Sequence, residues 1–141
     1  MSDPKAIERR YYEAFNSRDL DRYAELFTED CAVIASGGAQ MRGVEAMRAF
    51  DKGWHDAFPD CVITLESQTA EGNVVFSENT FNGTHTATLR TPAAEIPATG
   101  RSVTGHYVAM LVVRDGRIAS FRAYFDRLEL LEELGVVPVP A

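Results

Sequence analysis

The sequence contains little cysteine. Its two cysteines, Cys31 and Cys61, stand at the starts of separate apolar runs. Two thiols are too few for a disulfide framework, and neither has a partner at a metal-ligand spacing. We therefore expect two buried thiols in a reducing cytoplasm, and no bound metal.

The sequence also lacks a basic cluster and a long hydrophobic run. Fourteen Lys and Arg stand against 21 Asp and Glu, which gives a net charge of −7 and a pI of about 4.9. Nucleic acid and anionic membranes are therefore not expected as partners. No apolar run reaches membrane-spanning length, and the N-terminus carries charges where a signal peptide is apolar. We expect a soluble, cytoplasmic protein.

Motifs for cofactors and activated nucleophiles are absent too. The sequence shows no G-x-G-x-x-G, no P-loop and no Ser or Cys nucleophile motif, so no cofactor is expected. What is present is an ordinary globular composition, with 45% apolar and 25% charged residues, eight Phe and five Tyr. A chain of 141 residues then predicts a single domain, residues 1–141, with a sizeable core.

Three helices are predicted in the N-terminal half. Asp3 and Pro4 suit the start of a first helix that runs to about Phe15, and Asp19 suits the cap of a second. The third helix follows Gly43 and stops at Pro59. Apolar residues recur at helical spacing in all three: Ile7, Tyr11, Ala14 and Phe15, then Leu20, Tyr23, Ala24 and Phe27, then Val44, Met47, Phe50, Trp54 and Phe58.

Strands dominate the remainder of the chain. The apolar run 31–35 predicts one strand, and period-two alternation predicts others at about 61–66 and 74–82, with a bulge at Gly83. Residues 87–100 are expected to form a loop or a frayed strand, which could lie over a pocket mouth. Asp115-Gly116 predicts a hairpin between strands at about 102–113 and 117–126, before a short helix at 128–134. Helices segregated beside an antiparallel sheet predict an α+β fold.

Asp126, at the end of the last predicted strand, is our candidate for acid/base chemistry. Alternation places it on one strand face with Ile118, Ser120, Arg122 and Tyr124. Its D-x-x-E context with Glu129 is also typical of a helix cap, and the residues alone favour that role. Arg122 or Arg127 could instead hold Asp126 in a plain ion pair, which would make it a poorer base.

Several stretches resemble a known family. They are the Phe15-Asn16-Ser17-Arg18-Asp19-Leu20 segment with Leu26-Phe27, the segments 42–46 and 83–86, the Ile96-Pro97-Ala98-Thr99-Gly100-Arg101-Ser102-Val103 segment, and residues 114–135. Together they resemble the nuclear-transport-factor-2-like (NTF2-like) superfamily and, within it, the SnoaL-like polyketide cyclases. The resemblance implies a curved sheet wrapped by three helices into a cone that accepts a flat apolar molecule.

The resemblance also implies roles for two residues. Asp126 would be the acid/base of a cofactor-free intramolecular aldol ring closure, and His106 would help to position the substrate. Relatives often carry an aromatic residue where this chain has Arg122. Which of His106 and Tyr107 faces inward is left open by strand alternation. Further candidate contacts for a substrate are Tyr12, Phe15, Trp54, Phe58, Asn79, Phe81, His85, Arg122 and Tyr124.

Other functions stand beside ring closure. A ketosteroid-isomerase-like enzyme calls for an aspartate near the end of the first strand, where residues 35–37 are Ala-Ser-Gly. Limonene-type epoxide hydrolysis calls for two aspartates bridged by an arginine, of which Arg122 and Asp126 supply a part. A non-catalytic protein that binds a small apolar ligand, or an assembly module, is the third possibility. Apolar residues on both faces of the last two strands also suggest a homodimer through the outer sheet face.

Overall fold

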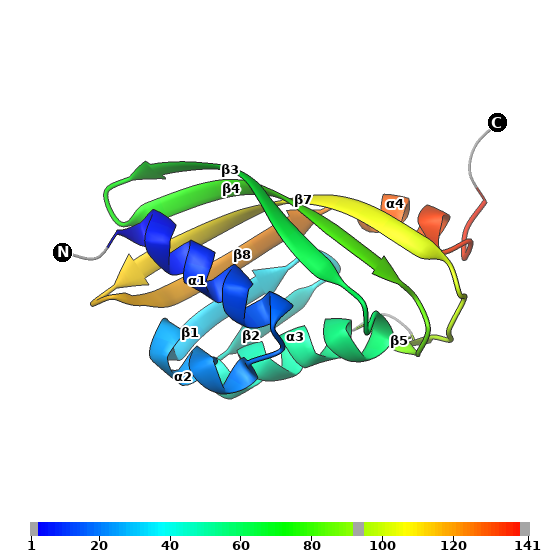
Figure 1. Cartoon of the computed structure of the whole chain (residues 1–141), viewed down its shortest axis with the longest axis horizontal. Helices are drawn as coiled ribbons and strands as arrows, with labels where there is room; N and C mark the ends of the chain where they lie inside the picture. The colour runs from blue at the N-terminus through cyan, green and yellow to red at the C-terminus, as the bar shows by residue number, and fades with distance from the viewer. Residues whose placement is uncertain (1–2, 92–94, 139–141) are drawn as a thin grey trace.

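A computed structural model describes residues 3–91 and 95–138 of the chain (Figure 1). The described chain forms short helices and a sheet of mostly long strands. In order, the elements are α1 (Pro4–Asn16), a 3-10 turn η1 (Leu20–Arg22), α2 (Tyr23–Leu26), β1 (Phe27–Ala35), β2 (Ala39–Arg42), α3 (Val44–Ala57), β3 (Val62–Glu71), β4 (Val74–Thr84), β5 (Leu89–Arg90), β6 (Glu95–Ile96), β7 (Ser102–Arg114), β8 (Arg117–Phe125) and α4 (Arg127–Glu133).

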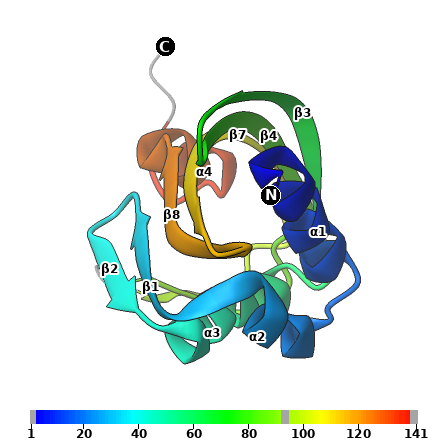
Figure 2. The ribbon, with the colours of Figure 1, turned by 90° about the vertical axis from the view of Figure 1, so that its left-hand side faces the viewer.

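Six strands form one curved sheet in the order β2-β1-β8-β7-β4-β3. β1 and β8 pair in parallel, and the other neighbours in this sheet pair antiparallel. The sheet is strongly curved, and α1, α2 and α3 lie across its open side (Figure 2). The predicted α+β cone with three N-terminal helices is therefore confirmed. None of the described helices is both long enough and apolar enough to cross a membrane.

The first and third helices form as their sequences predict. Asp3 caps α1 by accepting a hydrogen bond from the Lys5 amide at 3.0 Å, and Pro4 occupies the first turn. The second predicted helix is wrong in extent, because it breaks into η1 and the single turn α2. Asp19 makes no side-chain cap there, and Phe27 instead opens β1, where it pairs with Ile118. Burial of Phe27 between sheet and helix outweighs its place in a helical stripe.

The middle of the chain differs from expectation at Gly83. The bulge predicted at Gly83 is wrong, since β4 and β7 pair without a register shift through Thr84. Gly83 is needed for close packing instead, because a Cβ there would lie 3.0 Å from the Cβ atoms of Phe58 and Cys61. The region 87–100, predicted as a loop or a frayed strand, holds the two short strands β5 and β6; its residues 92–94 lie outside the described part of the chain.

The hairpin at Asp115-Gly116 is confirmed, and both residues have positive φ angles of 53° and 79°. The single face predicted for Ile118, Ser120, Arg122, Tyr124 and Asp126 is wrong. The pairing of β7 with β8 shifts register between Val112 and Val113, which inverts the alternation after Ile118. Buried Phe121 and Ala123 consequently face inward, while Ser120, Arg122 and Tyr124 form the outward row of β8.

Candidate functional site

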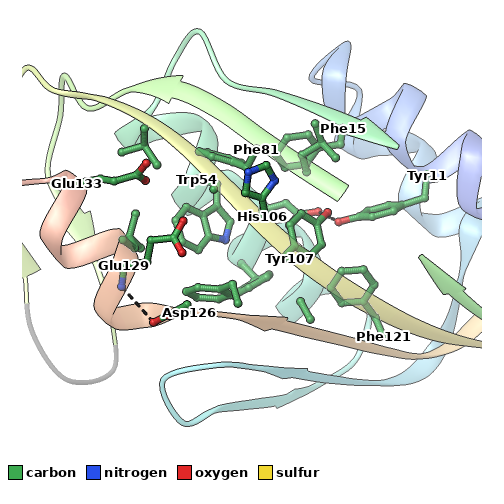
Figure 3. A pocket seen from close by; sticks show the side chains of 18 residues that line it. Tyr11, Phe15, Trp54, Phe81, His106, Tyr107, Phe121, Asp126, Glu129 and Glu133 are labelled. Carbon is green, nitrogen blue, oxygen red and sulfur yellow. Dashed lines mark hydrogen bonds between the residues drawn. The ribbon is translucent and has the colours of Figure 1, made fainter. Parts of the chain in front are cut away.

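A narrow apolar cavity lies between the concave face of the sheet and helices α1, α3 and α4 (Figure 3). Its enclosed volume is about 80 Å³. Aromatic side chains form most of the wall, and Trp54 packs edge-on against both Phe81 and Phe125, at centroid distances of 5.5 and 6.0 Å. The aromatic lining residues are Tyr11, Phe15, Phe50, Trp54, Phe81, Tyr107, Phe121 and Phe125.

A wider groove of about 340 Å³ shares wall residues with the cavity. Phe50, Trp54, Phe125 and Leu130 line both spaces, and Leu89 and Ile96 of β5 and β6 border the groove. Pockets for drug-sized ligands usually measure about 300–1,000 Å³. The cavity alone therefore holds one small part of a ligand, and a multi-ring ligand would extend into the groove.

Asp126 lies at the rim, where β8 gives way to α4. Its Oδ1 accepts a hydrogen bond from the Glu129 amide at 3.1 Å, so the predicted helix cap is present (Figure 3). Within the described chain, no residue hydrogen-bonds to its Oδ2, and neither Arg122 nor Arg127 forms an ion pair with it. Asp126 also lines the cavity, so capping leaves one carboxylate oxygen available at the opening.

Two further carboxylates project from α4 toward the cavity, those of Glu129 and Glu133 (Figure 3). Glu133 Oε1 accepts a long hydrogen bond of 3.4 Å from the Thr104 amide. Its Oε2 is buried without a partner among the described residues. Desolvation of this carboxyl by burial raises the pKa of Glu133 above its ordinary value. The rim is thus acidic, while the wall below it is apolar.

The opposite end of the cavity contains a buried carboxylate, Asp51 of α3. Tyr11 and Tyr23 both donate hydrogen bonds to its Oδ2, at 2.8 and 2.6 Å. Asp51 is only 2% exposed and has no cationic partner within the described chain. Burial raises its pKa to about 7, although the two phenol hydrogen bonds oppose the shift. Asp51 and Tyr11 line the cavity, so its inner end is polar.

β7 turns Tyr107 inward and His106 outward. Tyr107 lines the cavity and donates a hydrogen bond of 3.1 Å to the Tyr12 hydroxyl. His106 is exposed at the rim, where its Nδ1 lies 3.3 Å from Thr80 Oγ1 on the outer side of the sheet. His106 therefore borders the cavity only at its opening.

The structure brings only some of the predicted substrate contacts to the cavity. Phe15, Trp54 and Phe81 line it, together with Asp126 and His106. Arg122 and Tyr124 lie on the outward row of β8. The remaining candidates, Tyr12, Phe58, Asn79 and His85, are buried but do not line the cavity.

Those buried candidates have structural contacts of their own. Phe58 packs against Trp54 and Phe81 from behind the wall. His85 Nδ1 lies 2.9 Å from Thr99 Oγ1 and joins β4 to the segment before β7. Asn79 donates to Ser77 Oγ at 2.9 Å, and its Oδ1 has no partner among the described residues.

The sequence analysis missed Asp51, Glu129 and Glu133. Asp51 follows Met47 by four residues and precedes His55 by four, so it lies on the buried face of α3. An acidic residue on an apolar helical face was the available signal. Glu129 and Glu133 are likewise four residues apart and share one face of α4.

Metal ligation has no structural support in the part of the chain that is described. Within residues 3–91 and 95–138, no three side chains of His, Cys, Asp or Glu converge on one point. Cys31 and Cys61 are buried free thiols. The titratable side chains that line the cavity are carboxylates, phenols and one rim histidine.

Sequence comparison identifies the family. The profile of the SnoaL-like polyketide cyclases matches residues 5–134, nearly the whole chain. The chain belongs to the SnoaL-like polyketide cyclase family. Among proteins with curated functions, no sequence matches it significantly.

Solved structures share the fold. IdmH from Streptomyces antibioticus, a candidate polyketide cyclase, superposes with a TM-score of 0.79 at 27% identity, over 94% of this chain and 99% of IdmH. A candidate SnoaL-like polyketide cyclase from Jannaschia sp. CCS1 gives 0.83 at 20% identity, over 96% and 93%. An LEH-like epoxide hydrolase from M. tuberculosis gives 0.70 at 18% identity, over 93% and 88%. The similarity to the last two shows the fold alone.

Proposed function

We propose that this SnoaL-like protein is a cofactor-independent cyclase that closes a carbon ring in a polycyclic or ring-forming apolar carbonyl compound, with Asp126 as its acid/base group. One observation carries the proposal. Asp126 stands at the opening of an aromatic cavity with one carboxylate oxygen held by the α4 amide and the other without a partner among the described residues. The helix cap fixes the orientation of the carboxylate, which positions a base better than free rotation does.

The proposed reaction needs only one shuttled proton. Asp126 removes a proton from a carbon next to a carbonyl group, and the electron pair forms an enolate. The enolate carbon attacks a second carbonyl carbon of the same molecule, so a carbon–carbon bond forms and the carbonyl π bond opens to an alkoxide. The protonated Asp126 then returns its proton to that alkoxide.

Epoxide hydrolysis and ketosteroid isomerisation receive less support from the geometry. Arg122 lies on the outer row of β8, so it does not bridge carboxylates in the cavity as limonene-type epoxide hydrolysis would need. The first strand ends at Ala35 and is followed by Ser36, whose Oγ accepts a hydrogen bond from the Phe125 amide, so no aspartate stands where a ketosteroid-isomerase-like base is needed. Non-catalytic ligand binding stays the second candidate, because the capping bond gives Asp126 a structural role of its own.

The acid/base step can be tested with 1-indanone, a small bicyclic ketone. Enolisation exchanges its α-hydrogens for deuterium in D₂O, which NMR follows directly. We expect the wild-type protein to accelerate exchange and Asp126→Asn to abolish the acceleration. Asn is a good helix cap, so this variant should keep its stability, whereas Asp126→Ala should lose exchange and about 1 kcal/mol of stability.

A matched control is Asp30→Asn. Asp30 is an exposed aspartate paired with Arg114 at 2.9 Å and does not line the cavity. The Asp30→Asn variant should exchange the α-hydrogens of 1-indanone as fast as the wild type. If Asp126→Asn exchanges as fast as the wild type, Asp126 is not the base. If 1-indanone binds but the wild-type protein does not accelerate exchange, the protein is a binding protein.

We also propose that the protein is a cytoplasmic homodimer that pairs through the outer face of the sheet. Phe76, Val108 and Tyr124 lie on adjacent strands of this face and are 43–48% exposed. A second copy would cover this apolar strip, and the two free thiols fit a reducing compartment. Tyr124→Glu should convert the dimer to a monomer in light scattering after gel filtration; a wild-type monomer would contradict the proposal.

A further inference from the structure

The cavity has polar groups at both ends and an apolar wall between them. Asp126, Glu129 and Glu133 lie at the rim, and Tyr11 lies at the inner end (Figure 3). Asp51 also lines the cavity and accepts the 2.8 Å hydrogen bond of the Tyr11 hydroxyl, so it belongs to the same inner end. The proposed cyclase chemistry uses only the rim. The buried carboxylate at the inner end has no part in it, although burying a carboxylate without a cation is costly.

One carboxylate oxygen of Asp51 is left without a hydrogen-bond partner among the described residues. Tyr11 and Tyr23 come from two different elements, α1 and α2, yet both donate to Oδ2. No described residue hydrogen-bonds to Oδ1, and the side chain is 98% buried against a cavity that it lines. The two phenols therefore hold the carboxyl group in a fixed orientation and leave one acceptor unused.

We propose that Asp51 binds the inner end of the ligand, with its Oδ1 accepting a hydrogen bond from a hydroxyl group of that end. This inference rests on the proposed function, since it names the substrate class for the same cavity. The substrate is then an elongated apolar compound with a hydroxyl group at the end remote from the reacting carbonyl. Tyr11 and Tyr23 are positioning residues that hold Asp51 in place.

The protonation state of Asp51 decides which group it prefers. The ionised carboxylate accepts from an alcohol, whereas the protonated acid donates to a ketone. The titratable groups that interact with Asp51 are Tyr11, Tyr23, Tyr107 and Cys61 from neighbouring elements. His55 lies one turn further along α3. Burial raises the pKa of each phenol and of the thiol, so these groups stay neutral while Asp51 titrates. Burial lowers the pKa of His55, which favours its neutral form.

The test compares 1-indanol, 1-indanone and indane, which share one carbon skeleton. Trp54, the single tryptophan, lines the cavity, so its fluorescence reports binding. We expect the ratio of alcohol to ketone affinity to rise about tenfold between about pH 5.5 and about pH 8.5, the value of one hydrogen bond to a charged group. Indane has no polar group and gives the baseline for changes in the cavity itself.

Two variants separate binding by Asp51 from a general effect of pH. Asp51→Asn keeps the shape of the side chain but cannot ionise, so the affinity ratio should stop changing with pH. Tyr23→Phe removes a donor that lies outside the cavity wall, and the loss of its hydrogen bond should move the midpoint to higher pH. This second variant keeps the inference testable if Asp51→Asn does not fold.

Three results would overturn the inference: a pH-independent ratio in the wild type, an unchanged midpoint in Tyr23→Phe, or failure of both polar probes to bind. Asp126→Asn distinguishes this failure from that of the proposed function. It should keep the wild-type affinity ratio at every pH while it loses deuterium exchange. If the wild-type protein accelerates deuterium exchange but its affinity ratio does not change with pH, the role of Asp51 is contradicted and the acid/base role of Asp126 stands. If the ratio changes with pH but exchange is not accelerated, the acid/base role is contradicted and the role of Asp51 stands.

Discussion

Replacing Asp51 by Asn should change how the stability of the protein depends on pH. The carboxyl group of Asp51 is 2% exposed, and its pKa rises from the ordinary 3.8 to about 7. Burial raises the pKa more than the hydrogen bonds from Tyr11 and Tyr23 lower it. The folded state therefore holds a proton that the unfolded chain has already released between these two pH values.

The size of the effect follows from the shift. A shift of about three units at about 1.4 kcal/mol each corresponds to about 4 kcal/mol. Because the pKa of Asp51 is higher in the folded protein than in the unfolded chain, its contribution to the free energy of unfolding is fully present below pH 3.8. The contribution is lost as the pH rises to about 7. Total stabilities of small domains are about 5–15 kcal/mol, so the loss is a large part of the whole.

Urea unfolding of the wild type and Asp51→Asn at a series of pH values measures the effect. Subtracting the two curves removes the contribution of every other titrating group. We expect the difference to shift in favour of the Asn variant by about 4 kcal/mol from pH 4 to pH 8 and to level off beyond both ends. Asp56→Asn on the same helix is the control, because Asp56 is an exposed partner of Lys52 and should contribute less than about 1 kcal/mol at any pH.

A difference that stays within about 1 kcal/mol over this range would refute the reasoning. It would mean that water or a relaxed conformation solvates Asp51. The polar inner end of the cavity would then lose its main physical support.

Three further predictions concern packing, the helix–sheet junction and the outer face. Gly83→Ala should lower the free energy of unfolding by about 1–3 kcal/mol in urea titrations, since its Cβ would meet Phe58 and Cys61 at 3.0 Å; an unchanged midpoint would contradict this packing. Asn16→Ala should cost about 1–3 kcal/mol in the same assay, because Asn16 bonds both backbone groups of Ile63 at 2.8 and 2.9 Å. Arg122→Gln should leave 1-indanone affinity within about twofold of the wild type by Trp54 fluorescence, since Arg122 faces out; a tenfold loss would place it in the site.

Strands and helices could be predicted from the local sequence where tertiary packing did not oppose the local pattern. Asp3-Pro4 began α1, Asp115-Gly116 turned β7 into β8, and Asp126 capped α4, as predicted. Prediction failed where tertiary packing overrode the pattern. Phe27 was predicted on the apolar stripe of a helix but pairs with Ile118 in a strand. A register shift beside Ile118 inverted the inward and outward faces of β8.

The candidate site was predictable only in part for the same reason. Trp54, Phe81 and Asp126 lie on the cavity as expected, because each is a strong local signal. The position of Asp51 on the apolar face of α3 was a signal in the sequence, but its partners were not, because its hydrogen bonds come from Tyr11 and Tyr23, 40 and 28 positions away.

The sequence by itself determined the fold class, because hydrophobic periodicity, turn residues and caps act over a few neighbouring positions. It also determined the family, whose motifs run through most of the chain. Only the tertiary structure decided which side chains meet at the cavity. Strand register and helix packing bring together residues that are distant in the chain, and a shift of one residue exchanges the inner face of a strand for the outer one.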